Sequence, residues 1–261
     1  MILNPICMDV SAYPAELRPF LTDAAFYDSS CSPEARVTYV DKDNGYFLKS
    51  TPKGALEREN VLTRYFYGKG LSANVLSYIS GERDWLLTEK IGGDDCAASK
   101  YLEQPVRLCD TLAELLRTLH GADYKDCPVL DHTERYLADA ERNFQANRFD
   151  RGLFPDDWGY ASAGEAHRVI EARGHLLKTD TLLHGDYCLP NVILDNWRFS
   201  GFIDLGNGGV GDRHVDLFWA IWTFVFNLKT DKYSERFIDA YGRADVDEER
   251  LRIVAAVEMF G

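Results

Sequence analysis

The most informative part of this chain is His184-Gly185-Asp186-Tyr187-Cys188-Leu189-Pro190-Asn191, and Ile203-Asp204-Leu205-Gly206 follows it at a short interval. Asp186 and Asn191 are five positions apart, and Asp204 lies at the end of a hydrophobic segment that runs into a glycine. A single Asp or Asn in a loop is usually a cap or a turn residue. Two carboxylates and one amide at these intervals are poorly explained by turn formation alone.

The same intervals suit the transfer of a phosphoryl group from MgATP. Kinase catalytic loops place an Asp and an Asn at this spacing, and a later Asp after a strand holds the metal. Asp186 would accept or orient the proton of the attacking hydroxyl, while Asn191 and Asp204 offer the hard oxygen ligands that Mg²⁺ prefers. His184 could be a base or a zinc ligand, but it has no second His or Cys at ligand spacing. We therefore expect His184 to brace the turn.

A lysine upstream fits this chemistry. Lys49 lies in a predicted strand after the hairpin turn Asp43-Asn44-Gly45, where a kinase carries its phosphate-binding lysine. Glu59, in the next predicted helix, is expected to form the ion pair that holds this lysine, with Glu57 as the alternative partner. Phe47 projects from the same strand face as Lys49, so its ring would either stack on adenine or belong to the core.

The chain lacks the usual glycine-rich phosphate loops. No segment matches G-x-x-x-x-G-K-[ST], and no G-x-G-x-x-G precedes the first hairpin strand. Ser32-Pro33-Glu34-Ala35 lies there instead, so a phosphate contact would come from the Ser32 hydroxyl and neighbouring backbone N–H groups.

Hydrophobic periodicity predicts an α+β chain with two lobes. The first, residues 1–90, has a helix over 16–27, hairpin strands over 36–40 and 46–49, a helix over 56–67 and a strand over 85–88. The second, residues 91–261, begins after a hinge at about 89–95 and is mostly helical. Its helices are expected at 108–119, 132–147, 163–176, 213–228, 232–242 and 247–259, and short strands at 192–194 and 199–204 carry Asp204.

Composition is consistent with a cytoplasmic protein that has a cationic small-molecule substrate, and an acidic surface that serves only solubility explains the charge equally well. The formal net charge of −13 over 261 residues argues against a nucleic-acid partner, and no apolar run is long enough to span a membrane. The six cysteines are scattered without metal-ligand spacing and are expected to be reduced, and no signal peptide is expected. The oligomeric state, monomer or dimer, is left open.

These motifs together resemble the aminoglycoside 3′-phosphotransferase (kanamycin kinase) family, which has a two-lobed protein-kinase-like fold with a small antiparallel-sheet N-lobe and a mostly helical C-lobe. The resemblance runs from about Cys31 to Gly261. It rests on Phe47-Leu48-Lys49, the His-Gly-Asp stretch with Asn191, the string Ser200-Gly201-Phe202-Ile203-Asp204-Leu205-Gly206, and the closing Glu258-Met259-Phe260.

The resemblance implies phosphorylation of a hydroxyl, the 3′ one, on aminoglycoside antibiotics, and hence resistance. It implies ATP and Mg²⁺ as cofactors and Asp186 as the base. It also implies that backbone groups of Thr88 and Lys90 pair with the edge of adenine. The drug's ammonium groups would be bound by an acidic loop containing Asp156 and Asp157, and by Glu258 and the terminal carboxylate of Gly261.

The chain departs from the family pattern near the acceptor. Asn207 stands where members commonly have Arg after Ile-Asp-Leu-Gly, and Trp222 and Phe226 replace polar or charged contacts. The tail also ends one residue later, at Gly261. These differences concern which drugs are used.

Two alternatives remain open. One is another small-molecule kinase of the same fold that phosphorylates choline, homoserine, a macrolide or a fructosamine. The other is a nucleotide-binding regulator without transfer activity, against which intact Lys49, Asp186, Asn191 and Asp204 argue.

Overall fold

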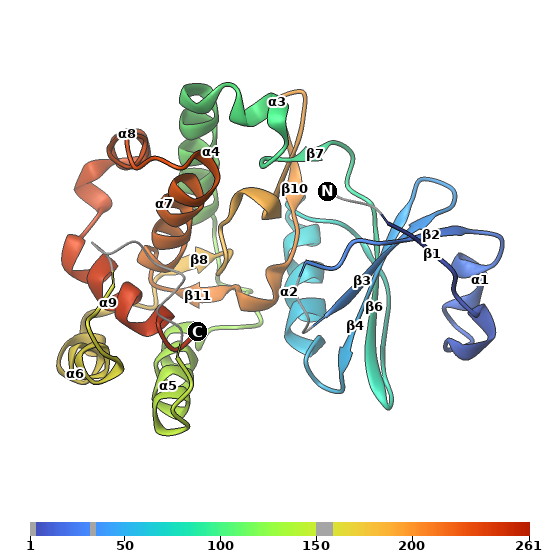
Figure 1. Ribbon diagram of the computed structural model, residues 1–261, viewed down its shortest axis with the longest axis horizontal. Coiled ribbons are helices and arrows are strands. Elements are labelled where there is room, and N and C mark those ends of the chain that lie inside the picture. The colour runs from blue at the N-terminus through green and yellow to red at the C-terminus, as the bar shows by residue number, and fades with distance from the viewer. Residues whose placement is uncertain (1–3, 32–34, 150–158) are drawn as a thin grey trace. The chain divides into compact units, whose positions relative to one another are not determined.

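The structure is a computed structural model that describes residues 4–31, 35–149 and 159–261. The chain divides into two compact units (Figure 1): unit 1 comprises residues 1–98 and 192–207, and unit 2 comprises 99–191 and 208–261. The sequence-based division at residue 90 assigned 91–98 and 192–207 to the second lobe, whereas here both segments pack with unit 1.

Unit 1 is built on a six-stranded antiparallel sheet in the order β1-β2-β3-β4-β6-β5. Its strands are β1 (Asn4–Ile6), β2 (Ala25–Asp28), β3 (Arg36–Asp41), β4 (Tyr46–Pro52), β5 (Val75–Ser80) and β6 (Arg83–Glu89). The predicted hairpin is confirmed as β3 and β4, with Tyr39 opposite Phe47. In its turn the left-handed backbone falls on Asp43 and Gly45, with φ of 53° and 91°.

The central strand β4 presents alternate side chains to opposite faces of this sheet. Leu48 packs in a hydrophobic cluster with Leu17 and Leu21, beside the short helix α1 (Arg18–Leu21) and the 3₁₀ turn η1 (Val10–Ala12). The next residue, Lys49, projects from the other face, because successive side chains of a strand alternate. On that face lies α2 (Glu57–Gly68), whose Glu59 contacts Lys49. The alternation therefore puts Leu48 into this cluster and Lys49 beside α2.

A second, three-stranded sheet of unit 1 carries Asp204. Its strands are β7 (Asp94–Asp95), β9 (Val192–Asp195) and β10 (Arg198–Phe202), in the order β10-β9-β7. Phe202 packs edge-on against Phe66 of α2, with ring centroids 6.4 Å apart. Asp204 lies two residues after the end of β10 and immediately before the 3₁₀ turn η4 (Leu205–Asn207). The two predicted strands are confirmed, although β10 ends before Asp204.

The helix predicted over 16–27 is wrong in its second half. Only Arg18–Leu21 is helical, the φ of Asp23 is +60°, and Ala25–Asp28 forms β2. Aromatic residues favour strands, and Phe26 and Tyr27 pair with β3, which would otherwise be an open sheet edge. The short or irregular strands β1 and β5 were not predicted.

Unit 2 is mostly helical, as predicted. Its helices are α3 (Ser99–Leu102), α4 (Pro105–His120), α5 (His132–Gln145), α6 (Ala163–Arg173), α7 (His214–Leu228), α8 (Ser234–Tyr241) and α9 (Glu248–Glu258). Its 3₁₀ turns are η2 (Gly174–Leu176), η3 (Leu189–Asn191) and η5 (Arg243–Asp245), and β8 (Thr181–Leu183) pairs with β11 (Gly209–Gly211). Helices α4 to α9 were all predicted, and their observed ends lie within a few residues of the predicted ones.

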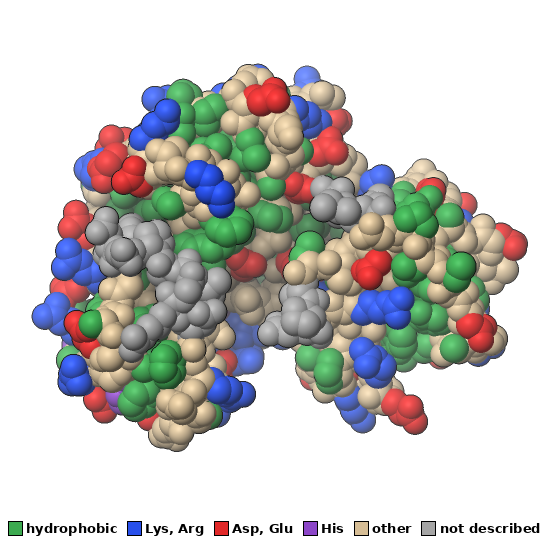
Figure 2. All heavy atoms as spheres, in the orientation of Figure 1, with side chains coloured by type: hydrophobic (Ala, Val, Ile, Leu, Met, Phe, Trp, Pro, Cys, Tyr) green, Lys and Arg blue, Asp and Glu red, His purple; other side chains and the backbone are tan. Residues whose placement is uncertain are grey.

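The face of the molecule shown in Figure 2 carries side chains of both charges. Acidic and basic side chains are interspersed on the face shown in Figure 2. Among the described residues, no helix is both long and apolar enough to cross a membrane. The longest apolar run of the sequence lies in α7. Nine residues of this helix are buried.

Candidate active site

Lys49 is the centre of a charged group in unit 1. Its Nζ lies 2.7 Å from Oε2 of Glu59 and also forms an ion pair with Oδ1 of Asp204. The sequence-based choice of Glu59 over Glu57 as the partner agrees with this geometry, since Glu57 is exposed at the start of α2. Helix α2 and the turn after β10 therefore bring two carboxylates to one amine.

Burial and charge act in opposite directions on this group. Burial lowers the pKa of Lys49, but the carboxylates of Glu59 and Asp204 outweigh it and hold the pKa above its usual value. Burial raises the pKa of Glu59, Lys49 opposes that shift, and Asp204 adds to it. Lys49 is thus a fixed cation, as an amine that contacts phosphate must be.

The backbone of Asp204 is in the left-handed region, with φ of +61°. A non-glycine residue pays for this conformation and keeps it only where the surroundings impose it. Its side chain is 52% exposed, in contrast to the nearly buried Glu59. Asp204 therefore presents a carboxylate that is held by Lys49 and is still open to a ligand.

The catalytic-loop residues form a compact group in unit 2. The loop leaves β8, whose three residues are buried, and reaches the turn η3. Nδ2 of Asn191 donates to the backbone oxygen of Asp186 at 2.9 Å and to its Oδ2 at 2.8 Å. One side chain thus closes the loop across five residues and fixes the carboxylate of Asp186.

A buried carboxylate that the sequence interpretation missed holds the start of this loop. Oδ2 and Oδ1 of Asp216, in the first turn of α7, accept from the backbone N–H groups of His184 and Gly185 at 2.8 and 2.7 Å. His120 lies 3.1 Å from the same carboxylate through Nε2. Burial alone would raise the pKa of Asp216, but the hydrogen bond with His120 and these other contacts lower it. The available signal was an acid directly before the apolar run that begins at Leu217.

His184 supports the loop from inside. Its side chain is buried, and Nδ1 accepts from the backbone N–H of Asp186 at 3.2 Å. This contact agrees with the prediction that His184 braces the turn.

The residues assigned to Mg²⁺ suit that ion by donor type. Because Nδ2 of Asn191 points at Asp186, its Oδ1 is the amide atom left to accept or to ligate. Asp204 adds an accessible carboxylate oxygen. Among the described residues no cluster of three His, Cys, Asp or Glu side chains could hold a metal by itself. Mg²⁺ is usually held by one or two protein oxygens together with phosphates and water.

The adenine contacts fit less well. Phe47 shares the face of Lys49 and stacks at a tilt on Tyr39, with centroids 5.3 Å apart. Thr88 lies inside β6, between Phe47 of β4 and Val75 of β5, so its backbone is within the sheet. The backbone N–H of Lys90 donates to the oxygen of Gly45 at 3.0 Å, which leaves only its carbonyl for a base edge.

The expected acceptor residues are only partly described, because Asp156 and Asp157 lie outside the described residues. Ser32, the expected phosphate contact, also lies outside them. Glu258, at the end of α9, is buried, and Oε1 accepts from Tyr136 at 2.7 Å and from Nε1 of Trp219 at 3.0 Å. Gly261 is exposed at the end of the chain.

Two of the aromatic departures lie together on α7. The rings of Trp222 and Phe226 are stacked with centroids 4.8 Å apart and planes at 12°. Phe226 is 53% exposed, and Nζ of Lys229 lies 4.3 Å from its ring centroid. The pair forms an accessible aromatic surface on the helix that also carries Trp219.

Comparison with known proteins gives consistent matches along the chain. The model of a phosphotransferase enzyme family matches residues 33–254. A probable aminoglycoside 3′-phosphotransferase of Lactococcus lactis subsp. lactis is 49% identical over 260 residues, which is 99% of either chain. An aminoglycoside 3′-phosphotransferase of Niallia circulans is 31% identical over 180 residues, covering 69% of this chain and 68% of its own.

Solved structures confirm the fold. An aminoglycoside phosphotransferase of Streptomyces rimosus superposes with a TM-score of 0.77 at 24% identity, over 97% of this chain and 99% of its own. An aminoglycoside-3′-phosphotransferase of type VIII gives 0.75 at 24% identity, over 96% of both chains. The predicted kinase-like fold, with an antiparallel-sheet lobe and a helical lobe, is thereby confirmed.

Proposed function

The chain belongs to the phosphotransferase enzyme family, and we propose that it transfers the γ-phosphoryl group of ATP to a hydroxyl of an aminoglycoside antibiotic. The 49% sequence identity to a probable aminoglycoside 3′-phosphotransferase extends over nearly the full length of both chains. This similarity supports both the acceptor class and the 3′ position. Such a transfer inactivates a drug that depends on its hydroxyls and ammonium groups, and so confers resistance. The supply of ATP places the reaction in the cytoplasm.

The observation that carries the proposal is the loop that Asn191 closes onto Asp186. A phosphotransferase does little covalent chemistry, and its catalysis is mostly positioning and neutralisation of charge. Asp186 accepts or orients the proton of the acceptor hydroxyl while that oxygen attacks phosphorus. Asn191 fixes the carboxylate for this task at 2.8 Å, and Asp216 fixes the backbone that carries it.

On the nucleotide side, Lys49 holds the phosphates. Glu59 keeps the amine in place and Asp204 shares it. Phe47 contributes to the adenine pocket from the same face of β4, and the Ser32 hydroxyl contacts phosphate. For the adenine edge the proposal keeps the backbone of Thr88 and the carbonyl of Lys90, since the N–H of Lys90 donates to Gly45.

Oδ1 of Asn191 and the carboxylate of Asp204 are the residues that would hold Mg²⁺. The ion would supply charge neutralisation on the transferred phosphoryl group. Since Asp204 also pairs with Lys49, the carboxylate links the metal to the phosphate-binding amine.

The acceptor is a polycation, so carboxylates should bind it. The described residues hold Glu258 through two neutral donors, and the terminal carboxylate of Gly261 lies three residues further on. Asp156 and Asp157 complete the proposed acidic loop. Charge-assisted hydrogen bonds from ammonium groups to these oxygens would give both affinity and orientation.

The test is product analysis. Kanamycin or neomycin incubated with the enzyme and MgATP should gain one phosphoryl group by mass spectrometry, at the 3′ oxygen by phosphorus NMR, and Asp186→Ala should abolish the gain. A panel with choline, homoserine, a macrolide and a fructosamine is measured in parallel. Turnover of one of these with none of the aminoglycosides would replace the acceptor, and no turnover of any would favour a nucleotide-binding regulator.

The acidic loop has its own test. Changing Asp156 and Asp157 together to Asn should raise the KM for drug by about tenfold and leave the KM for ATP within about twofold, because only the drug is cationic. Equal changes in the two constants would remove the loop from the acceptor site.

A further inference from the structure

Three helices of unit 2 converge on the carboxyl group of Glu258. The hydroxyl of Tyr136, from α5, donates to Oε1 at 2.7 Å. Nε1 of Trp219, from α7, donates to the same oxygen at 3.0 Å. Oε2 accepts no hydrogen bond from any residue that the structure describes. In the part of the chain that the structure describes, Oε1 thus has two donors and Oε2 has none.

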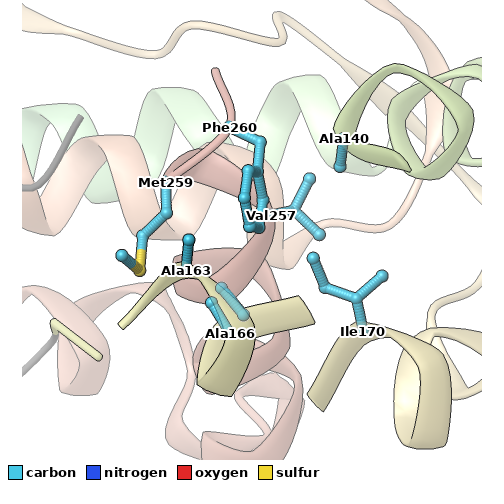
Figure 3. Packing of buried hydrophobic residues seen from close by; sticks show 8 residues of the cluster. Ala140, Ala163, Ala166, Ile170, Val257, Met259 and Phe260 are labelled. Atoms are coloured by element: carbon cyan, nitrogen blue, oxygen red, sulfur yellow. The ribbon is translucent and has the colours of Figure 1, made fainter. Parts of the chain in front are cut away.

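The end of α9 cannot shift to relieve this arrangement. Val257, Met259 and Phe260 pack with residues of α5 and α6 in the cluster shown in Figure 3. Nδ2 of Asn143, in α5, donates to the backbone oxygen of Phe260 at 2.6 Å. The residues on both sides of the carboxyl-bearing side chain are therefore anchored.

The two donors are fixed as well. The ring of Tyr136 stacks on His132, with centroids 5.6 Å apart and planes at 29°. The indole of Trp219 meets Phe218 and Trp222 edge-on at 5.7 and 5.3 Å. The indole N–H of Trp219 donates to Oε1, and the hydroxyl of Tyr136 lies closer to Oε1, at 2.7 Å, than to its other acceptor, the backbone oxygen of Val254 at 3.4 Å.

Within the described ranges, the carboxyl of Glu258 has no cation of the protein as a partner. Among the described residues no Lys, Arg or His forms an ion pair with Glu258. Burial raises its pKa to about 7, the hydrogen bonds from Tyr136 and Trp219 oppose that shift, and the charge of Asp186 adds to it. Among the described residues, the buried thiol of Cys188 also interacts with Glu258. The hydrogen bonds from the two neutral donors therefore favour the ionised form of the carboxyl group near neutral pH.

We propose that Tyr136 and Trp219 are positioning residues for acceptor binding, which hold Oε1 of Glu258 so that an ionised Oε2 receives an ammonium group of the acceptor. This inference rests on the proposed function for the identity of the acceptor, whereas the effect of the two donors on Glu258 is a property of the free protein. Neither residue contacts the reacting atoms.

Two substitutions remove the donors and keep the rings. Tyr136→Phe deletes the hydroxyl, and Trp219→Phe deletes the indole N–H. A hydrogen bond to a charged group is worth about a tenfold change in an ionisation constant, so each variant should raise the titration midpoint of Glu258 by about one pH unit. The midpoint is read by NMR of the free protein labelled with ¹³C at the glutamate carboxyl, and the Glu258→Gln spectrum identifies the signal.

The kinetic consequence depends on pH in a way that a packing defect would not. If the midpoint moves from near 7 to near 8, the ionised fraction at pH 7 falls from about one half to about one tenth. The KM for drug should then rise about fivefold at pH 7, return to the wild-type value near pH 9, and leave the KM for ATP and kcat within about twofold.

Tyr160→Phe is the matched control. The hydroxyl of Tyr160 donates to the backbone oxygen of Arg252 in the same helix α9, at 2.7 Å, and does not contact Glu258. It should move neither the midpoint nor the KM profile. A midpoint of Glu258 that stays in place in Tyr136→Phe and Trp219→Phe, or moves equally in Tyr160→Phe, overturns the inference. A shifted midpoint in a protein that does not phosphorylate aminoglycosides would confirm the positioning and refute the proposed acceptor.

Discussion

The two units hold their functional carboxylates in opposite ways. In unit 1, Glu59 and Asp204 are both paired with the cation of Lys49. In unit 2, Asp186 is held by the neutral amide of Asn191, and Glu258 by Tyr136 and Trp219. In the first arrangement a cation of the protein lies between the two carboxylates, whereas in the second the described residues supply neutral donors, so the negative charge is left for a ligand.

The difference matches the charges of the two substrates. A nucleotide triphosphate is an anion, so a fixed ammonium held by carboxylates suits it. An aminoglycoside is a polycation, and carboxylates without a protein cation suit that. Even Asp216, which supports the loop, is bound by backbone N–H groups and by His120, whose pKa burial lowers toward the neutral form. In the described part of unit 2, the carboxylates of Asp186 and Glu258 are therefore held by neutral groups.

Asp186→Ala should give the largest effect and tests the uncompensated side of the comparison. The variant removes the proton acceptor and the partner of Asn191, so kcat should fall by at least about a thousandfold. ATP affinity, measured by calorimetry, should persist because Lys49, Glu59 and Asp204 are untouched. Asp195→Ala, which removes an exposed carboxylate at the end of β9, is the control and should keep full activity. Near-normal turnover of Asp186→Ala would take Asp186 out of this role.

Glu59→Gln tests unit 1, in which the cation of Lys49 holds two carboxylates. The substitution keeps the shape but removes one of the two charges that hold Lys49, which can then follow Asp204 alone. We expect kcat/KM for ATP to fall by about 10- to 100-fold, with the KM for drug little changed. Glu57→Gln, in the same first turn of α2 but exposed, is the matched control. Similar losses in both variants would mean that net charge on α2, and not the ion pair, matters.

The contacts of this site that could be predicted from the sequence are those between residues that lie close together along the chain. Asp186 and Asn191 are joined within one loop, and the i to i+2 alternation of a strand puts Phe47 and Lys49 on one face. The ion pair of Lys49 with Glu59 followed from the position of one strand and the next helix. Each of these relations spans at most about one helix, where local geometry determines contacts.

The parts that it did not predict depend on tertiary packing. Asp216 reaches the loop from a helix 30 residues later in the chain, and only the fold shows that its carboxylate accepts from His184 and Gly185. Nothing local links Tyr136, Trp219 and Glu258, which come from three helices. The strand Ala25–Asp28 was taken for helix because the pairing edge offered by β3 is also a long-range feature.

Glu258→Gln tests the comparison through the pH dependence of the free energy of unfolding. Of the three substitutions it should have the smallest effect. The folded pKa of about 7 lies above the value of 4.5 for an ordinary glutamate, so between these pH values the folded state binds more protons than the unfolded state. Rising pH should therefore lower the free energy of unfolding of the wild type relative to Glu258→Gln, by about 3 kcal/mol in total, with no further change above pH 7 to 8. Gln keeps an oxygen for Tyr136 and Trp219 and does not ionise. Urea unfolding of both proteins from pH 4.5 to 8 measures the difference, and Glu248→Gln, exposed on the first turn of α9, is the control. A constant difference across this range would show that Glu258 is compensated after all, and the contrast between the two units would then not extend to the acceptor side.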